Sequence, residues 1–455
     1  MPIIEEIVDD STTEDVDPFE AAIQPLSKDL PIPSEFLSDG AASDPAKQAQ
    51  LKQWKFSAEM HLHHLQQYLR TKPELSLEQR ARVVITAGVF RGEDSYSTSV
   101  MHMSAMSSVK LVIMPNLKAG ERYGYAPSAL LELVLKEHIK PLFQATPHPQ
   151  INLDSGRKLP HQAGGNAAAQ DFYEDQTWKT KGLGCWNVLT WCVEHMLPES
   201  FQDMWPLLVP PIMTLMDDWE ATFRIKGILV VDELLKQTDG QLLKRTGVDK
   251  LLFASLENSF SQLHTPQTPQ LLFDAIRCYT VLTTRVTAPE SEERFNRLSD
   301  GISKGVLNAW SYAGSDVATM QSAAEGLALL VTELGIGSVR FLKAIIPQLS
   351  DNLYTKPFVP PARALQLSTA ECLRVVIHEC ALTITEWKER ILHGLLKAWV
   401  EVNRIVNKDQ DTLAVQTALK EVWGELLLAC PTIPQVETPQ LHTLDTNMFQ
   451  ALIAA

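Results

Sequence analysis

The sequence predicts an all-α fold, an α-solenoid of stacked helix pairs with no significant β-sheet. Two observations lead to this prediction: one segment has the pattern of a helix pair, and one residue pattern recurs along the chain. No stretch shows the sustained alternation of apolar and polar residues that is typical of a half-buried strand.

The helix-pair segment is PLLVPPIMTLMDDWEATFRIKGILVVDELLKQ, residues 206–237. Apolar residues fall at helical spacing on both sides of an acidic turn formed by Asp217 and Asp218. Pro206 suits a first helical turn, whereas Pro210 and Pro211 would each cost roughly 3 kcal/mol in a regular helix interior. We therefore expect the first helix to begin near these prolines or to kink there.

The recurring pattern is a small residue followed by a branched apolar one, called here the small–branched pair. A period of roughly 40–47 residues with two helices per period is typical of HEAT-type repeats. We therefore expect about six to eight repeats, each too thin to bury its apolar face alone. The pairs are Gly182-Leu183, Gly227-Ile228, Ala275-Ile276, Gly326-Leu327, Cys372-Leu373 and Ala418-Leu419, in steps of 45, 48, 51, 46 and 46 residues.

Charge and composition divide the chain into an acidic N-terminal segment and a longer helical part. Residues 1–46 contain twelve acidic residues and one basic residue, Lys28, and are dotted with proline. We predict an acidic, flexible N-terminal segment over 1–46 and a single HEAT-like α-solenoid over 47–455. A stretch rich in Pro, Gly and Asn predicts a long loop insertion at about 144–171.

Composition also argues against several classes of protein. The net charge is −15 and no basic stripe is present, so we expect no nucleic acid partner. No run approaches the ~18 apolar residues of a membrane span, and the N-terminus lacks the features of a secretory signal, so we expect no membrane partner. Six scattered cysteines without CxxC pairs predict reduced thiols and a cytoplasmic and nuclear localisation.

No motif predicts catalysis, a cofactor or a metal ion. The glycine-containing stretch KGLGC has Asn187 where a dinucleotide loop needs its third glycine. His61, His63 and His64 lack the acidic or cysteine partner that would complete a metal site. We predict no catalytic, cofactor-binding or metal-binding residues, and an active site assembled from distant residues stays an open alternative.

Partner binding is expected from aromatic and basic residues. Trp219 follows the acidic turn, at the expected edge of the solenoid, and exposed aromatic residues are typical interface anchors. Three further tryptophans lie in the C-terminal repeats. We predict partner-binding roles for Trp219, Arg224, Lys226, Trp387, Trp399 and Trp423.

Five residues are expected to be structural repeat positions. Asp217 and Asp218 precede a helix, and we expect them to cap it and to complement its dipole. Gly182, Gly227 and Gly326 are the glycines of the small–branched pairs, and we expect them to let neighbouring helices approach closely.

Residues 206–237 resemble the signature region of the Tti-two family. The resembling features are LLVPPIMTLMDD, the acidic turn followed by Trp219, and RIKGILVVDELL with Lys226 and Gly227. The downstream stretches LLFDAIRCYTVL and FLKAIIPQLSDNLY are also similar, and the resemblance covers roughly residues 175–380.

The resemblance implies a non-catalytic, HEAT-type subunit of the TTT co-chaperone complex. Its implied partners are the larger HEAT-type Tti-one subunit and the Tel-two subunit. The implied clients are phosphatidylinositol-3-kinase-related kinases, matured with the ninety-kilodalton heat-shock chaperone and hence linked to TOR signalling and the DNA damage response. The family supplies no catalytic residues. Another HEAT-type adaptor, such as a transport receptor or phosphatase scaffold, stays an open alternative.

Overall fold

The fold consists of two helical units. A computed structural model describes residues 17–37, 44–71, 74–113, 126–144, 147–160, 176–354 and 362–454. Unit 1 contains the described residues up to 144 and those of 176–207, and unit 2 contains 147–160 and the described residues from 208 onward. Within these ranges no β-strand occurs, and the β-pairing is one isolated antiparallel bridge between Ile151 and Lys158. The predicted all-α fold is confirmed.

Unit 1 is built around α2, which packs against α4, and α3, which packs against α4 and α9. Its elements are α1 (Pro18–Gln24), η1 (Pro25–Asp29), η2 (Ser34–Leu37), α2 (Pro45–Arg70), α3 (Leu77–Gly88), η4 (Val89–Arg91), α4 (Ser99–Ile113), α5 (Ser128–Leu133), η5 (Val134–Ile139), α6 (Lys140–Phe143), α8 (Thr177–Lys181), α9 (Cys185–Glu194), η6 (Pro198–Ser200) and the first part of α10 (Phe201–Met216).

The described part of the acidic N-terminal segment is folded onto unit 1. Asp17 caps α1 by accepting a hydrogen bond from the Phe19 amide at 3.0 Å. Phe19 and Ile23, four residues apart and therefore on one helix face, are buried, and α1 contacts α2. Glu20 pairs with Arg82 of α3. Residues 1–16 and 38–43 of the expected flexible segment lie outside the described residues.

Unit 2 continues from the remainder of α10. Its elements are α11 (Ala221–Gln237), α12 (Gly240–Thr246), α13 (Val248–Phe260), α14 (Thr268–Val286), α15 (Glu292–Asp300), η7 (Gly301–Leu307), α16 (Asn308–Tyr312), α17 (Val317–Leu334), η8 (Gly335–Phe341), α18 (Leu342–Asn352), α19 (Arg363–Glu379), η9 (Ile384–Trp387), α20 (Lys388–Arg404), α21 (Gln410–Ala429) and α22 (Ile433–Ile453).

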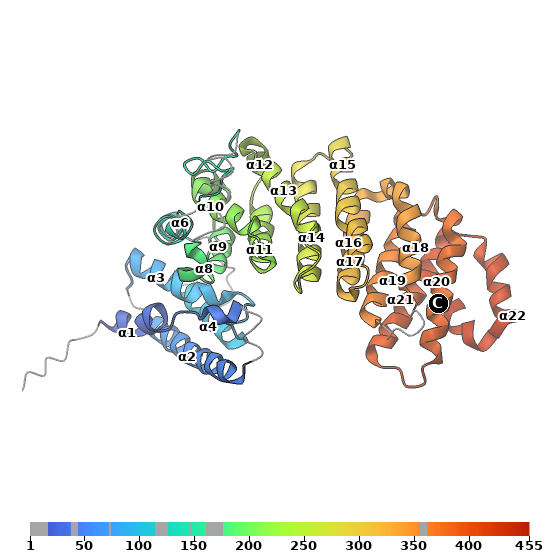
Figure 1. The fold of residues 1–455 in the computed structure, drawn as a ribbon, viewed down its shortest axis with the longest axis horizontal. Coiled ribbons are helices and arrows are strands. Elements are labelled where there is room, and N and C mark those ends of the chain that lie inside the picture. The colour runs from blue at the N-terminus through green and yellow to red at the C-terminus, as the bar shows by residue number, and fades with distance from the viewer. Residues whose placement is uncertain are drawn as a thin grey trace, which may run out of the picture. The chain divides into compact units, whose positions relative to one another are not determined.

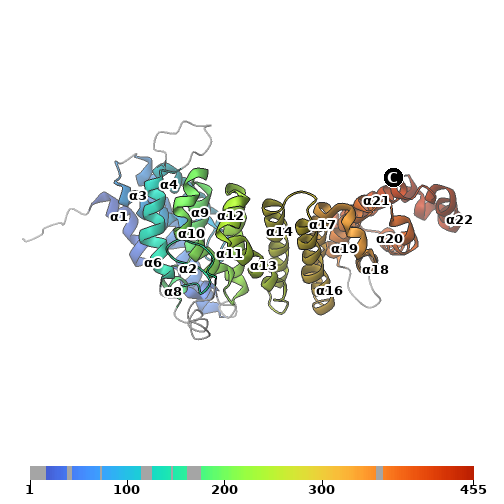
Figure 2. The same ribbon diagram turned by 90° about the horizontal axis from the view of Figure 1, so that it is seen from above.

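Five helices of unit 2 form a continuous row. In this row, called the α11–α21 row, α11 packs against α14, α14 against α17, α17 against α19, and α19 against α21. Figures 1 and 2 both show α14 and α17 side by side, followed by α19. A second set of helices covers the row, with α13 on α14, α16 on α17, α18 on α19 and α20 on α21. Because each helix is buried by its neighbours, the core extends along the row.

The small–branched pairs mark the helices of the row. The pairs beginning at Gly227, Ala275, Gly326, Cys372 and Ala418 lie one in each of its five helices, and these small residues are buried. The pair beginning at Gly182 differs, because it lies between α8 and α9 in unit 1 and outside any helix.

Helix α10 contains all three prolines of the helix-pair segment. It begins at Phe201, so of the two expected alternatives a start near the prolines is wrong, and a kink at Pro210 and Pro211 stays a prediction. Pro206, Pro210 and Pro211 are all within it. The Thr214 hydroxyl donates a hydrogen bond to the Pro210 carbonyl at 3.0 Å, so this carbonyl has a side-chain partner within α10.

Candidate interaction surfaces

The acidic turn between α10 and α11 is a structural junction of unit 2. Asp217 accepts a hydrogen bond from the Ser255 hydroxyl of α13, and its Oδ2 lies 2.9 Å from His148 Nε2. His148 belongs to the described part of the expected 144–171 insertion, so Asp217 joins that segment to α13. Residues 161–171 of the insertion lie outside the described residues.

Asp218 shapes the turn before α11, but it does not cap that helix as predicted, because the N-cap residue is Glu220. Its side chain is fully buried, and its Oδ1 accepts a hydrogen bond from the Glu220 amide at 2.8 Å. The Asp218 carbonyl accepts a second hydrogen bond, from Arg224 Nε at 2.5 Å. The two aspartates thus have different roles: Asp217 binds residues of two other segments, and Asp218 forms hydrogen bonds within the turn.

Arg224 is a core residue, so its predicted role in partner binding is wrong for this fold. It is buried, and Nη1 donates to the Ser259 hydroxyl of α13 at 3.2 Å. Its charge is therefore used to join α11 to α13. Lys226, two residues further along α11, is half-buried. Trp219 is 63% exposed, which leaves its ring accessible from solvent.

The C-terminal tryptophans divide into one accessible and two core residues. Trp387 ends η9 and is half-buried. Trp399 and Trp423 are fully buried, so the prediction that they bind a partner is wrong for this fold. Trp399 Nε1 also donates to the Met448 carbonyl of α22 at 2.9 Å, which joins α20 to α22. Their positions follow the helical spacing of the core face rather than an exposed edge.

The three predicted glycine positions all lie at close contacts. A Cβ on Gly182 would come 2.6 Å from Leu142 Cδ1 in unit 1. A Cβ on Gly227 would come 2.8 Å from the Met216 amide nitrogen, so α11 crosses the α10 backbone at this glycine. Gly326 lies against α14. Each site therefore excludes a larger side chain, although only Gly227 and Gly326 are helical.

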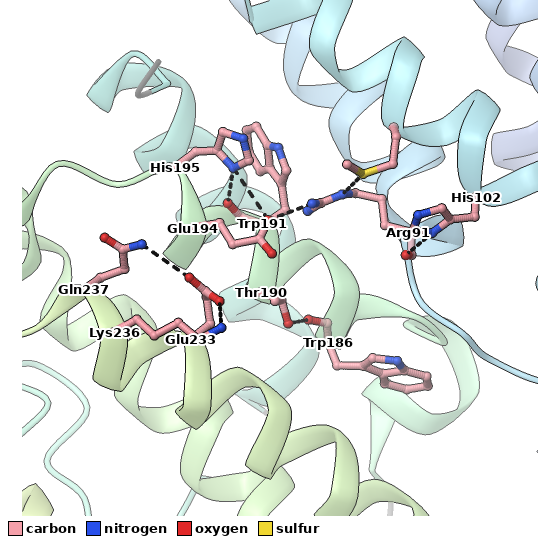
Figure 3. Close-up of polar contacts among 11 residues, drawn as sticks. Arg91, His102, Trp186, Thr190, Trp191, Glu194, His195, Glu233, Lys236 and Gln237 are labelled. Carbon is pink, nitrogen blue, oxygen red and sulfur yellow. Dashed lines mark hydrogen bonds and ion pairs between the residues drawn. The ribbon is translucent and has the colours of Figure 1, made fainter. Parts of the chain in front are cut away.

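Several ionisable side chains of unit 1 lie close together (Figure 3). Arg91 Nη2 lies 2.6 Å from Glu194 Oε2, and Arg91 Nε donates to Met106 Sδ at 3.0 Å. His102 Nδ1 lies 2.5 Å from the Arg91 carbonyl, and His195 Nδ1 lies 3.0 Å from the carbonyl of Trp191. These contacts connect η4, α4 and α9, so we assign this cluster a structural role.

The dinucleotide-like stretch also has a structural role. Asn187, which breaks its glycine pattern, donates from Nδ2 to buried Asp94 at 2.7 Å. Tyr96 donates to the same carboxylate at 3.0 Å, and burial, reinforced by the Asp94 charge, raises the pKa of Tyr96 well above its ordinary value. Asp94 thus joins the turn before α4 to α9.

The α11–α21 row carries polar contacts between neighbouring helices. Asp232 of α11 forms an ion pair with Arg277 of α14, which also binds Asp274 at 3.1 Å. Glu325 of α17 accepts a hydrogen bond from the Ser368 hydroxyl of α19 at 2.7 Å. These contacts link α11 to α14 and α17 to α19 along the row.

The thiols show no sign of activation. All six cysteines are buried and free. Burial raises the pKa of Cys185 to about 12 and that of Cys380 to about 11, so both stay protonated near neutral pH. Within the described ranges, no group of three or more His, Cys, Asp and Glu side chains could hold a metal ion. No helix in the described part of the chain has the length and apolar character of a membrane span.

A groove between α20 and α22 is a concave surface of unit 2. Its volume is about 750 Å³, and apolar side chains of both helices line it together with the ring of Tyr354. This groove was not predicted from the sequence, and partner binding was assigned to the nearby tryptophans instead. The available signal was a mixed stripe on one face of α20, from His393 through Lys397 to Arg404.

The fold and these surfaces define an all-α protein in which stacked helices present a groove and exposed aromatic residues. The sequence model of the Tti2 (Tti-two) family matches residues 95–361, which is more than half of the chain, and the chain belongs to this family. The match begins further toward the N-terminus than the resemblance described above, and it ends just before α19. The family consists of non-catalytic co-chaperone subunits, and membership supports a subunit of the TTT complex in general.

Proposed function

We propose that this chain is a non-catalytic scaffold subunit of the TTT co-chaperone complex. In this role it supports the maturation and stability of phosphatidylinositol-3-kinase-related kinases, together with the ninety-kilodalton heat-shock chaperone. The observation that carries the proposal is the Tti2 family match over residues 95–361. Its direct partners are the Tti-one and Tel-two subunits, and it acts in the cytoplasm and nucleus, upstream of TOR signalling and the DNA damage response.

The mechanism we propose is binding. Stacked helices offer a long surface, and each further helix adds area without a new fold. Such a surface holds a client kinase and a chaperone assembly close together, which raises the effective concentration of each for the other. The cross-helix contacts, such as Asp232 with Arg277, support this role because they keep the surface in one arrangement.

Affinity capture of the full chain from its native cells tests the proposal. We expect the captured material to contain the two other TTT subunits and kinases of this class. Depletion of the chain is expected to lower the steady-state level of those kinases while their transcripts stay unchanged, because maturation acts on the protein. Recovery of the chain alone under gentle conditions, or unchanged kinase levels after depletion, would contradict the proposal.

Substitution of Trp219, which is exposed, and of Trp387, which is half-buried, makes the same experiment more specific. Trp219→Ala and Trp387→Ala are expected to reduce capture of the TTT subunits, because accessible tryptophans are frequent interface anchors. Tyr312→Ala is the matched control, since Tyr312 is also an exposed aromatic residue of unit 2. Equal capture by all three variants would remove the two tryptophans from the interface.

A further inference from the structure

The groove between α20 and α22, called here the C-terminal groove, combines an apolar floor with a positively charged rim. Three α22 residues and six α20 residues line it, together with Tyr354, which follows α18. The α20 residues lie at the spacing of one helix face. The lining residues are Tyr354, His393, Leu396, Lys397, Val400, Glu401, Arg404, Leu441, Leu444 and Phe449.

A break in α22 lies beside the groove. Asp445 has non-helical backbone angles, φ −163° and ψ 96°, and its Oδ1 accepts a hydrogen bond from the Met448 amide at 3.0 Å. The Met448 carbonyl in turn accepts the Trp399 hydrogen bond from α20. The break lets Leu444, before it, and Phe449, after it, line the same groove. Leu444 is 76% exposed, so an apolar side chain stands open to solvent at this place.

The rim has an excess of positive charge. Lys397 and Arg404 are exposed, and neither forms an ion pair with another residue in the described part of the chain. Lys397 Nζ lies 4.6 Å from the centre of the Tyr354 ring, which positions the ammonium group at the rim. The carboxylate in the lining, Glu401, is bound by Arg363 Nη1 at 2.9 Å, so its charge is balanced. This local positive charge contrasts with the chain's net charge of −15.

These features favour one kind of occupant. The α20 part of the lining runs from His393 to Arg404, which is about three helical turns and roughly 17 Å at 1.5 Å per residue. An amphipathic helix of that length places apolar side chains at i, i+3, i+4 and i+7 into an apolar groove. Carboxylates beside those anchors would meet Lys397 and Arg404. Two cations over an apolar floor suit such a helix better than a nucleic acid backbone, which requires many phosphate contacts.

We propose that the C-terminal groove binds an acidic amphipathic helix of a protein partner. The proposal deepens the scaffold function and rests on it for its place in the cell, but the binding itself is measurable on the isolated chain. Leucine or similar anchors of the partner helix displace water from the floor of the groove. The acidic flank selects the partner and its direction through the two rim cations.

The test is fluorescence anisotropy with the full chain and two labelled synthetic peptides. Both peptides carry leucine at i, i+3, i+4 and i+7, and the remaining positions are mainly glutamate in one and mainly lysine in the other. We expect saturable binding of the glutamate peptide, weakened by added salt, and much weaker binding of the lysine peptide.

Substitutions in the groove lining test whether the peptide binds there. The double variant Lys397→Glu with Arg404→Glu, and separately Leu444→Asp, are each expected to raise the Kd for the glutamate peptide about tenfold or more. The matched controls are Lys250→Glu and Leu428→Asp, which alter exposed residues of unit 2 outside the groove lining and should leave the Kd unchanged. Thermal unfolding of every variant shows that the fold is retained. Binding of the lysine peptide by the charge-reversed variant would be the strongest support.

Three outcomes would overturn the proposal: no binding of the glutamate peptide to the wild-type chain, equal binding of both peptides, or control variants that weaken binding as much as groove variants. Dimerisation of the chain that Leu444→Asp abolishes would also overturn it, because a second copy would then be the occupant. Parallel capture from cells separates the two proposals. If the chain captures TTT subunits but binds no peptide, the scaffold function stands and the groove proposal fails. If the chain binds the glutamate peptide but captures no TTT subunits, the groove proposal stands and the scaffold function fails.

Discussion

Gly326 on α17 lies directly against Ile276 on α14: a Cβ on Gly326 would come 2.8 Å from Ile276 Cδ1 and 3.0 Å from Ile276 Cγ2. Both residues belong to small–branched pairs, in neighbouring helices of the α11–α21 row. The small member of one pair therefore accommodates the branched member of the pair before it. At this position the contact sets the distance between α14 and α17, whereas Gly227 of the pair in α11 faces the α10 backbone instead.

Substitution of Gly326 tests this contact. Gly326→Val is expected to lower the free energy of unfolding by about 1–3 kcal/mol, because the new side chain overpacks the contact with Ile276. Gly424→Ala is the matched control: Gly424 also lies in a helix, α21, but a Cβ there would meet nothing within 4 Å. That control should be neutral or stabilising by up to about 1 kcal/mol, because alanine favours helices. Urea unfolding measures both, and equal effects would contradict the interpretation.

Asp217 is expected to hold residues 147–160 in place. Asp217→Ala removes the partner of His148 and of the Ser255 hydroxyl, and we expect it to cost about 1–3 kcal/mol. Amide hydrogen exchange should accelerate over 147–160, because the attachment to the acidic turn is lost. Asp154→Ala changes an exposed aspartate on the same segment and serves as the control. Unchanged exchange in Asp217→Ala would show that other contacts suffice.

Trp399 is expected to matter for stability through both its ring and its N–H group. Trp399→Phe keeps most of the buried aromatic surface but removes the hydrogen bond to the Met448 carbonyl, so we expect a loss of about 0.5–1.5 kcal/mol. Trp399→Ala should cost about 3–5 kcal/mol, because it also opens a cavity. Thermal unfolding ranks the two variants. If both were neutral, the core assignment of Trp399 would be untenable.

Buried thiols are expected to make the fold sensitive to alkali. The folded pKa values of Cys185 and Cys380, about 12 and about 11, lie above the ordinary thiol value of 9.0. The unfolded chain therefore releases these protons at a lower pH than the folded chain, and stability falls as pH rises above about 9. We expect a loss of about 1 kcal/mol per thiol by about pH 10, measured by urea unfolding under reducing conditions.

Cys380→Ala provides the control for this pH dependence. The variant is less stable at neutral pH because it loses buried volume, but its stability should decline less steeply between about pH 9 and about pH 10. A slope identical to that of the wild-type chain would show that Cys380 does not titrate as proposed. Labelling with a thiol reagent should be slow in the folded chain and complete in urea, because all six thiols are buried.

Periodicity predicted the helices well and the exposure of particular residues poorly. The helix from Ala221 to Gln237, the acidic turn before it and the small–branched pairs of unit 2 all follow from local spacing. Position in the sequence identified Trp219 beside the acidic turn as exposed, but it did not show that Trp399 and Trp423, within helices, are buried. For α10 the expected start near the prolines is wrong, because this helix begins at Phe201 and continues through all three of them.

Residues 17–37 show a second reason for the difference. Their acidic composition predicts a flexible segment, whereas Phe19 and Ile23 lie at the spacing of one helix face. Composition averages over a segment, whereas folding depends on whether a few apolar residues find a matching surface. That surface is α2, which the chain reaches only after a further stretch of sequence.

By itself, the sequence determined that this protein is all-α, where the acidic turn and the small–branched pairs lie, and to which family it belongs. These properties depend on neighbours within a few turns of helix, and on motifs that are contiguous in the chain. Only the tertiary structure decided that Arg224 and Trp399 are core residues, that Asp217 meets His148, and that α20 and α22 enclose a groove. These contacts join residues that lie dozens of positions apart in the chain, as Trp399 and Met448 do. Packing between such distant residues leaves no pattern in the local sequence.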